Sequence, residues 1–213
     1  MKVLRDILYG VSLDAVSGDT AVEIAEVQFD SRRVGDQDVF VAVRGLVSDG
    51  HDYISKAVEL GARAIVCEEV PEQTVEGVTY VQVKHSATAL SIMAANFYDN
   101  PSKNLKLVGV TGTNGKTTTT TLLHELFHSA GYSVGLISTI KVLVGTKEYP
   151  ATHTTPDPLS INKYLSMMCG AGVEFCFMEV SSHGIDQKRI EGLHFAGAVF
   201  TCLLYTSPSP RDA

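Results

Sequence analysis

The sequence predicts an α/β protein with a small amino-terminal α/β domain, followed by a central domain with a mostly parallel sheet. Two observations lead to this prediction: apolar strand-like runs alternate with helix-like segments along the chain, and the short polar stretch 100–104 separates two such patterns. We therefore expect one domain over residues 1–101, a second over 102–201, and a tail of different composition over 202–213.

The overall composition excludes several classes of protein. The net charge is −7 and no run of Lys or Arg occurs, which argues against a nucleic-acid partner. No segment approaches the roughly 18 apolar residues of a membrane span, and charges interrupt the first residues, so neither a membrane partner nor a signal peptide is expected. The four cysteines lack zinc-site spacing; we expect reduced packing residues in a cytoplasmic protein.

The first domain begins with alternating residues that predict a strand over 22–29. Apolar runs predict further strands over 39–43, 64–67 and 79–83. Helical spacing predicts helices over 52–60, with Ile54, Ala57 and Val58 on one face, and over 86–98, with Ser86 as the cap.

The second domain repeats the alternation. We expect strands over 106–110, 133–138, 174–179 and 196–201, a hairpin over 140–149 broken at Gly145, and helices over 117–130 and 158–170. Ligands of such sheets bind at the carboxyl ends of the strands.

A glycine-rich turn joins the strand over 106–110 to the next helix. The turn has the pattern of a P-loop, in which backbone N–H groups and a helix N-terminus hold phosphates, so the domain is predicted to be of the P-loop ATPase type. Val110 stands where the strict pattern has glycine, so this is a tighter variant. The predicted ATP-binding residues are Gly112, Thr113, Asn114, Gly115, Lys116, Thr117 and Thr118.

Two of these positions, together with Glu179, carry the predicted chemistry. Lys116 would reach the β- and γ-phosphates, and the Thr117 hydroxyl would bind Mg²⁺. Glu179 ends an apolar strand, where a carboxylate is costly unless paired or metal-bound, so we predict that it also binds Mg²⁺. Lys116 and Glu179 are the candidate catalytic residues; an ordinary strand-end glutamate is the alternative for Glu179.

Polar residues follow two other strands. The segment 153–158 offers two hydroxyls and a proline at a helix start, either as a pocket of donors or as a simple cap at Thr155 or Asp157. His183 fits a general base, a metal neighbour or a histidine that hydrogen-bonds the loop, and we favour the last. Residues 187–189 suit an anionic substrate or a solvated helix face.

Several stretches together resemble the Mur ligase family, and within it the branch that adds a diamino acid. They are Thr-Gly-Thr-Asn-Gly-Lys-Thr-Thr over 111–118, Met-Glu-Val-Ser-Ser-His-Gly over 178–184, His-Thr-Thr-Pro-Asp-Pro over 153–158, and Phe-Asp-Ser-Arg over 29–32. The resemblance runs from about residue 22 to 201 and is far more specific than the P-loop alone.

The resemblance assigns roles to further residues. It implies that Phe29, Ser31, Leu46, Val47 and Ser48 contact the UDP-sugar end of the substrate. It implies that the muramoyl-peptide end is held by His153, Thr154, Thr155, Ser181, Gln187 and Arg189. His153 stands where many members have asparagine.

The implied reaction is amide formation driven by ATP with Mg²⁺. The D-glutamate carboxylate of UDP-N-acetylmuramoyl-L-Ala-D-Glu attacks the γ-phosphate of ATP, and the amine of a diamino acid then displaces phosphate from the acyl phosphate. Lys116 and Mg²⁺ would neutralise charge on the transferred group. The D-Ala-D-Ala-adding branch, a folate polyglutamate ligase and a non-catalytic nucleotide-binding regulator are the alternatives.

After Thr201 the sequence no longer follows the family pattern. Its last twelve residues are rich in Ser and Pro, and we expect a truncated frame with a foreign tail. The family's diamino-acid-binding domain is not represented, so lysine and meso-diaminopimelate cannot be distinguished as substrates. We therefore expect this chain by itself to form no tripeptide product.

Overall fold

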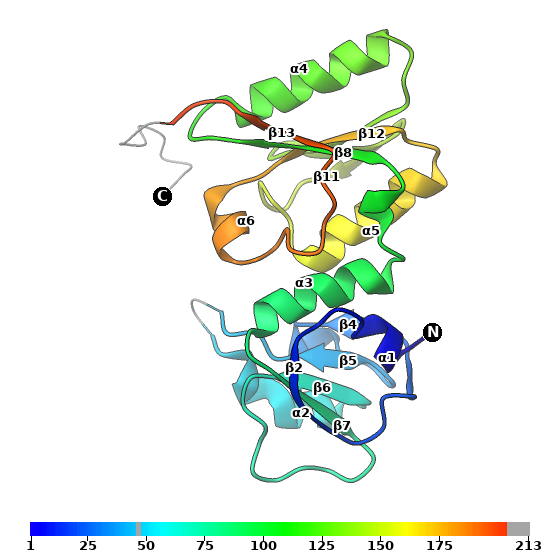
Figure 1. Ribbon diagram of the computed structural model, residues 1–213, viewed down its shortest axis with the longest axis vertical. Helices are drawn as coiled ribbons and strands as arrows, with labels where there is room; N and C mark the ends of the chain where they lie inside the picture. Colours follow the sequence, from blue (N-terminus) through cyan, green and yellow to red (C-terminus); the bar gives the residue numbers. More distant parts are fainter. Residues whose placement is uncertain (46–47, 204–213) are drawn as a thin grey trace. The chain divides into compact units, whose positions relative to one another are not determined.

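The computed structural model describes residues 1–45 and 48–203. The chain forms two compact units, one ending at Phe97 and the other beginning at Tyr98 (Figure 1). Among the described residues, no helix is both long and apolar enough to cross a membrane.

The first unit is built on a five-stranded sheet in the order β2-β7-β6-β5-β4. β4 to β7 are parallel to one another, and β2 is antiparallel to β7. The strands are β2 (Leu13–Ser17), β4 (Val27–Gln28), β5 (Val39–Val41), β6 (Ala64–Cys67) and β7 (Thr79–Val83), beside the separate antiparallel pair β1 (Lys2–Val3) and β3 (Glu23–Ile24).

Helices complete the first unit. They are α1 (Leu4–Ile7), α2 (Ile54–Glu59) and α3 (Ser86–Phe97), with 3₁₀ turns η1 (Ser31–Arg33) and η2 (Gly50–Tyr53). One apolar cluster joins α2 to the sheet through Ile54, Ala57 and Phe40. The expected face of α2 is therefore confirmed, although its first turn is 3₁₀ rather than α-helix.

Two local predictions for this unit were wrong. The predicted strand 22–29 is divided into β3 and β4, because the Ala25 N–H bonds Gln37 O, and the two pieces pair with different strands. Ser86 is the first residue of α3 rather than its cap, and its hydroxyl donates to Glu68 Oε1 at 2.9 Å.

The second unit is built on a six-stranded sheet in the order β11-β10-β9-β12-β8-β13. The four strands β9, β12, β8 and β13 are parallel, and β10 and β11 extend the sheet as an antiparallel hairpin. The strands are β8 (Lys106–Thr111), β9 (Val134–Ile137), β10 (Lys141–Val144), β11 (Lys147–Pro150), β12 (Phe175–Glu179) and β13 (Gly197–Phe200).

Helices cover both faces of this sheet (Figure 1). α4 (Lys116–Ser129) packs on one face through Leu123 and Phe127, which meet Phe175 and Phe177 of β12. α5 (Pro158–Gly170) packs on the other face. The remaining helices are η3 (Pro101–Lys103) and the short α6 (Ser182–Asp186), neither of which was among the helices predicted from the sequence.

The alternation of β12 decides where its last residue points. Phe175 and Phe177 face α4, whereas Cys176 and Met178 face α5. Since successive side chains alternate across a strand, Glu179 falls on the α4 face. The first turn of α4 also begins there, so the strand period alone brings Glu179 toward that turn.

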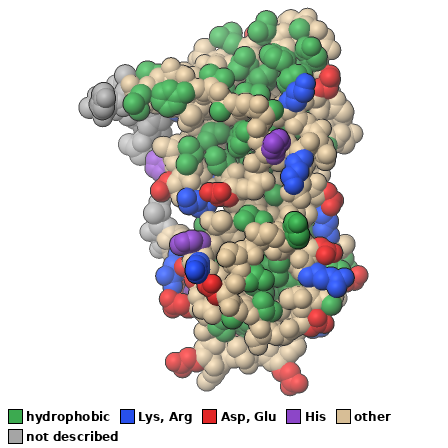
Figure 2. Space-filling view, in the orientation of Figure 1, with side chains coloured by type: hydrophobic (Ala, Val, Ile, Leu, Met, Phe, Trp, Pro, Cys, Tyr) green, Lys and Arg blue, Asp and Glu red, His purple; other side chains and the backbone are tan. Residues whose placement is uncertain are grey.

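Positively and negatively charged side chains are mixed on the surface seen in Figure 2. On the face seen in Figure 2, Lys and Arg side chains are interspersed with Asp and Glu over the described residues.

Candidate functional site

The glycine-rich turn between β8 and α4 has the backbone that the sequence predicts. Gly112 has φ 136° and Gly115 has φ 87°, values that favour glycine. Gly115 is the N-cap of α4, so the unbonded N–H groups of the first helical turn face the loop. Asn114 and Thr118 are exposed at this point of the chain. The turn can therefore hold an anion at a helix N-terminus.

The Lys116 ammonium lies inside this loop. Its Nζ donates to Gly112 O at 2.7 Å and to Thr113 O at 3.3 Å. These bonds keep the charge against the loop rather than extended into solvent. A phosphate placed on the loop would meet this ammonium.

Glu179 is fully buried, and both oxygens of its carboxylate accept hydrogen bonds. Oε2 accepts from Thr117 Oγ1 at 3.0 Å and from Thr139 Oγ1 at 3.1 Å, and Oε1 accepts from the Thr139 N–H at 2.8 Å. The exposed strand-end alternative is therefore wrong. A buried carboxylate is costly without such partners.

The donor set of Glu179 and Thr117 suits a hard divalent cation. One carboxylate and one hydroxyl oxygen lie 3.0 Å apart, and Mg²⁺ prefers oxygen ligands while keeping waters and phosphate oxygens in its other positions. Among the described residues, no cluster of three or more His, Cys, Asp or Glu side chains offers a competing metal site.

Thr139 was missed by the sequence analysis. It follows β9, whose neighbour in the sheet is β12, and its Oγ1 lies 3.2 Å from Thr154 Oγ1, so the Thr154 hydroxyl can donate to it while Thr139 donates to Glu179. The only signal was its place just after a parallel strand, and nothing in the sequence says that β9 neighbours β12.

The segment after β11 is held to the end of β12. Thr155 Oγ1 donates to Glu179 O at 3.1 Å, lies 3.1 Å from Ser181 Oγ, and accepts from the Ser181 N–H at 2.9 Å. Asp157, rather than Thr155, caps α5 by accepting from the Ser160 N–H. Both interpretations of this segment thus hold together, on different residues.

Arg189 closes the same region. Its Nη1 donates to Thr155 O at 2.5 Å, and its Nε and Nη2 donate to Gln187 Oε1 at 3.0 and 2.5 Å. Burial lowers the pKa of the guanidinium, while Asp157 acts in the opposite direction. Gln187 and Arg189 are therefore tied to the pocket wall, and a solvated helix face is the wrong interpretation for them.

These segments line one cavity of about 760 Å³. It takes in nine predicted residues, namely Gly112, Thr113, Lys116, His153, Thr154, Thr155, Ser181, Gln187 and Arg189. Its lining also includes residues that the prediction left out, namely Thr111, Thr139, Thr152, Ser182, His183, Ile185, Phe200 and Leu203. Its described lining contains no carboxylate side chain, so the cavity suits an anionic ligand.

The His183 imidazole lines this cavity and makes no hydrogen bond within the described residues. The loop-bonding role that we favoured for His183 is therefore not found. Ser181 forms the hydrogen bond within this loop instead, since Ser181 Oγ accepts from the Gly184 N–H at 3.1 Å.

The described sugar-binding candidates lie in the first unit: Phe29 and Ser31 follow β4, and Ser48 lies between β5 and η2. Phe29 is exposed, Ser31 is buried in η1, and Ser48 Oγ donates to the Tyr53 hydroxyl at 3.2 Å. Leu46 and Val47 lie outside the described residues. The next residue after Phe29, Asp30, accepts from Arg32, which lowers the pKa of that carboxyl to about 2.

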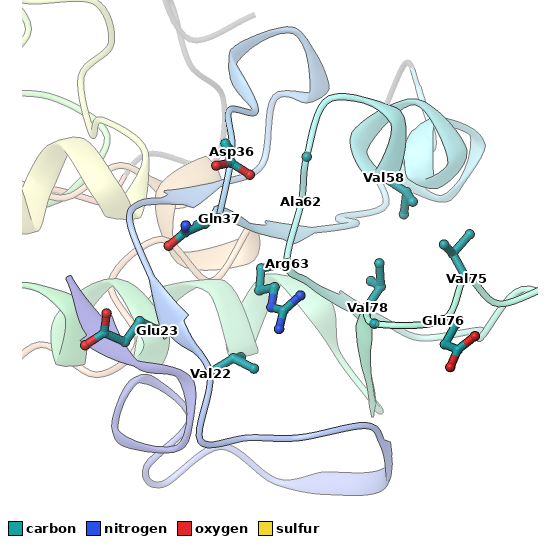
Figure 3. Close-up of a pocket in the computed structure, with 12 residues that line it drawn as sticks. Val22, Glu23, Asp36, Gln37, Val58, Ala62, Arg63, Val75, Glu76 and Val78 are labelled. Atoms are coloured by element: carbon teal, nitrogen blue, oxygen red, sulfur yellow. The ribbon is translucent and has the colours of Figure 1, made fainter.

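A second cavity, of about 560 Å³, lies at the other end of the first sheet. Gln37, Arg63 and Val78 precede β5, β6 and β7, and they line it together with Val22 and Glu23 (Figure 3). None of the described sugar-binding candidates lines this cavity. The second cavity is therefore separate from the predicted sugar-binding site.

Comparisons with known proteins agree with the motifs. A model described as the Mur ligase middle domain matches residues 110–205, and one described as the Mur ligase family catalytic domain matches residues 23–98. A 2,6-diaminopimelate ligase of Cytophaga hutchinsonii, named for UDP-N-acetylmuramoyl-L-alanyl-D-glutamate, is 54% identical over 93% of this chain. Its namesake in Bacteroides thetaiotaomicron is 49% identical over 94%. The chain spans 41% and 42% of these two relatives.

Solved structures give the same fold. The structure of a ligase with the same name aligns over 98% of this chain and 42% of its own, with a TM-score of 0.76 at 23% identity. MurF from Acinetobacter baumannii aligns over 84% of this chain and 36% of its own, with a TM-score of 0.57 at 20% identity.

Proposed function

The chain belongs to the Mur ligase family, and on that premise we propose that it is the amino-terminal and central part of an ATP-dependent ligase acting on UDP-N-acetylmuramoyl-L-Ala-D-Glu. We propose 2,6-diaminopimelate as the amine substrate, because the two relatives cited above carry that name. The work of such an enzyme belongs to peptidoglycan synthesis in the cytoplasm.

One observation carries the proposal. The buried carboxylate of Glu179 meets the Thr117 hydroxyl of the phosphate-loop helix, beside a cavity lined by cations and hydroxyls. This arrangement suits a nucleotide triphosphate and an acidic acceptor placed next to one another.

In the proposed reaction the chain contributes binding and charge. Loop residues 112–118 hold the triphosphate, and Lys116 balances charge on the transferred phosphoryl group. Glu179 and Thr117 would hold Mg²⁺, which would supply positive charge to offset the charge of the phosphates. Arg189 and the hydroxyls of Thr154 and Ser181 orient the peptide carboxylate toward the γ-phosphate.

The chemistry proceeds in two steps. A carboxylate oxygen of the D-glutamate residue attacks the γ-phosphorus, and the bond to the ADP oxygen breaks, giving ADP and an acyl phosphate. The amine nitrogen then attacks the acyl carbon, inorganic phosphate leaves, and the nitrogen loses a proton. Activation is needed because a carboxylate oxygen is a poor leaving group.

Binding to the purified chain tests the proposal. We expect Mg-ATP binding in calorimetry, and a loss of at least tenfold in affinity for Lys116→Ala, because the loop ammonium is removed. Lys147→Ala, on the exposed strand β11, is the matched control and should leave the affinity unchanged.

The acceptor is tested by titrating UDP-N-acetylmuramoyl-L-Ala-D-Glu against the corresponding tripeptide. Preference for the dipeptide supports the proposal. Preference for the tripeptide would favour the D-Ala-D-Ala-adding branch, and ATP binding without any UDP-sugar binding would favour a nucleotide-binding regulator.

A further inference from the structure

Thr201 follows β13 and lies beside the phosphate loop. β13 pairs in parallel with β8, so that Phe200 stands opposite Thr111, and the Thr201 N–H donates to Thr111 O at 2.9 Å. Thr201, the residue after β13, therefore lies where the phosphate loop leaves the neighbouring strand β8. The sequence analysis treated Thr201 only as a strand end.

The Thr201 hydroxyl spans the loop. Its Oγ1 lies 2.6 Å from Asn114 O and 3.1 Å from Thr111 O. Because a hydroxyl has one proton, it donates to one of these carbonyls at a time, and the shorter distance favours Asn114. Thr111 precedes the loop and Asn114 stands just before Gly115, so one side chain contacts both ends.

The packing between loop and strand end is close. A Cβ at Gly112 would collide with Thr201 Oγ1 and would lie 2.8 Å from Cys202 N. In addition, the Thr113 N–H donates to Cys202 O at 2.8 Å, a contact between main-chain atoms only. The loop is therefore seated on residues 201 and 202, and glycine at 112 permits the approach.

Two side chains donate hydrogen bonds to the carbonyl oxygens of loop residues 112–114. Lys116 Nζ binds Gly112 O and Thr113 O, and Thr201 Oγ1 binds Asn114 O. A carbonyl oxygen repels a phosphate oxygen, whereas an N–H attracts it. Tying the carbonyls to donors leaves the loop's N–H groups, apart from that of Thr113, which donates to Cys202 O, as the groups that it can offer to an anion.

We propose that Thr201 is a positioning residue of the phosphate loop, whose hydroxyl fixes the Asn114 carbonyl and so preorganises the loop for a nucleotide triphosphate. The inference rests on the proposed nucleotide site. If Lys116 leaves the loop carbonyls to meet phosphate, Thr201 still holds Asn114.

Replacing the hydroxyl by a methyl group tests this role. Thr201→Val keeps the shape and removes the hydrogen bond, and we expect the dissociation constant of Mg-ATP to rise by about 3- to 10-fold. Thr201→Ser keeps the hydroxyl and should restore binding. Thr146→Val, at the exposed β10–β11 turn, makes the same chemical change away from the loop and should have no effect.

Two readouts separate positioning from folding. The first is the thermal midpoint without nucleotide, which a merely structural role would lower while leaving the affinity of the folded fraction intact. The second is amide hydrogen exchange of the peptide spanning 111–116, which should accelerate in Thr201→Val and not in Thr201→Ser. The affinity is measured by calorimetry well below each variant's midpoint.

The outcomes are distinct. Weaker ATP binding and faster loop exchange in Thr201→Val, both rescued by serine, support the proposal. Unchanged affinity in Thr201→Val, or weakening that serine does not rescue, overturns it while the nucleotide site stands. Absence of ATP binding by the unaltered chain overturns the proposed function, and this inference with it.

Discussion

Glu179 shows how a single residue joins burial to chemistry. Its side chain is wholly removed from solvent, yet it accepts bonds from the Thr117 and Thr139 hydroxyls and from the Thr139 N–H. These bonds offset the cost of burying a charge without supplying a neutralising cation. A carboxylate held in this way is ready to meet a metal bound with nucleotide.

Substituting Glu179→Gln tests that role. Glutamine keeps the size but removes the negative charge, so we expect the affinity for Mg-ATP to fall about tenfold or more, with little change for ATP measured in EDTA. Glu148→Gln, on β11 and paired with Lys141 at 3.1 Å, is the control. An equal loss with and without Mg²⁺ would show that Glu179 acts on the fold or the loop and not on the metal.

At the scale of the element, α4 serves both core and site. Its first turn contains Lys116, Thr117 and Thr118 of the phosphate loop, and Leu123 and Phe127 on its inner face pack against the sheet. Two histidines one turn apart, His124 and His128, lie with ring centroids 6.2 Å apart and planes at 17°. Desolvation, followed by repulsion from His128, lowers the pKa of His124.

This shift predicts a pH dependence of stability. The pKa of His124 is lower in the folded chain than its ordinary value of 6.5, so below about pH 6.5 the unfolded chain binds more protons at this residue. The free energy of unfolding therefore falls as pH drops from 6.5 toward the folded pKa. The thermal midpoint should drop less between pH 7.5 and pH 5.5 in His124→Gln than in the unaltered chain. Identical drops would contradict this origin.

At the scale of the whole molecule, two units carry separate sets of predicted contacts. Gly112 to Arg189 lie in the second unit, and Phe29, Ser31 and Ser48 lie in the first. Each unit has its own apolar core. A ligand that binds one unit stabilises that unit directly by mass action.

Hydrogen exchange measured by unit checks this division. Mg-ATP should slow amide exchange in peptides from 111–118 and from 139, and leave the peptides of the first sheet unchanged. UDP alone should do the reverse, protecting the peptides around 29–31 and 48–50. Protection of the first sheet by ATP alone would contradict the assignment of the two ligands.

The sequence by itself determined the local features of this protein. The strands over 64–67 and 79–83 and the helix over 158–170 form where apolar periodicity and flanking residues place them, because these signals act within one element. The phosphate loop could also be predicted from the sequence, because its glycines, Lys116 and Thr117 lie close together along the chain. Glu179 was predicted from its place at the end of an apolar strand, and the family resemblance then suggested substrate roles for Thr155 and Arg189, which stay predictions.

Only the tertiary structure decided which residues meet. Glu179 ends β12, and Thr139 and Thr201 follow β9 and β13. Thr139 meets Glu179, and Thr201 meets the loop after β8, because the sheet order is β9-β12-β8-β13. That order depends on pairing between segments far apart in the sequence, and one chain's periodicity carries no information about it. The break between β3 and β4 has the same cause, since Ala25 bonds to Gln37 rather than continuing a strand.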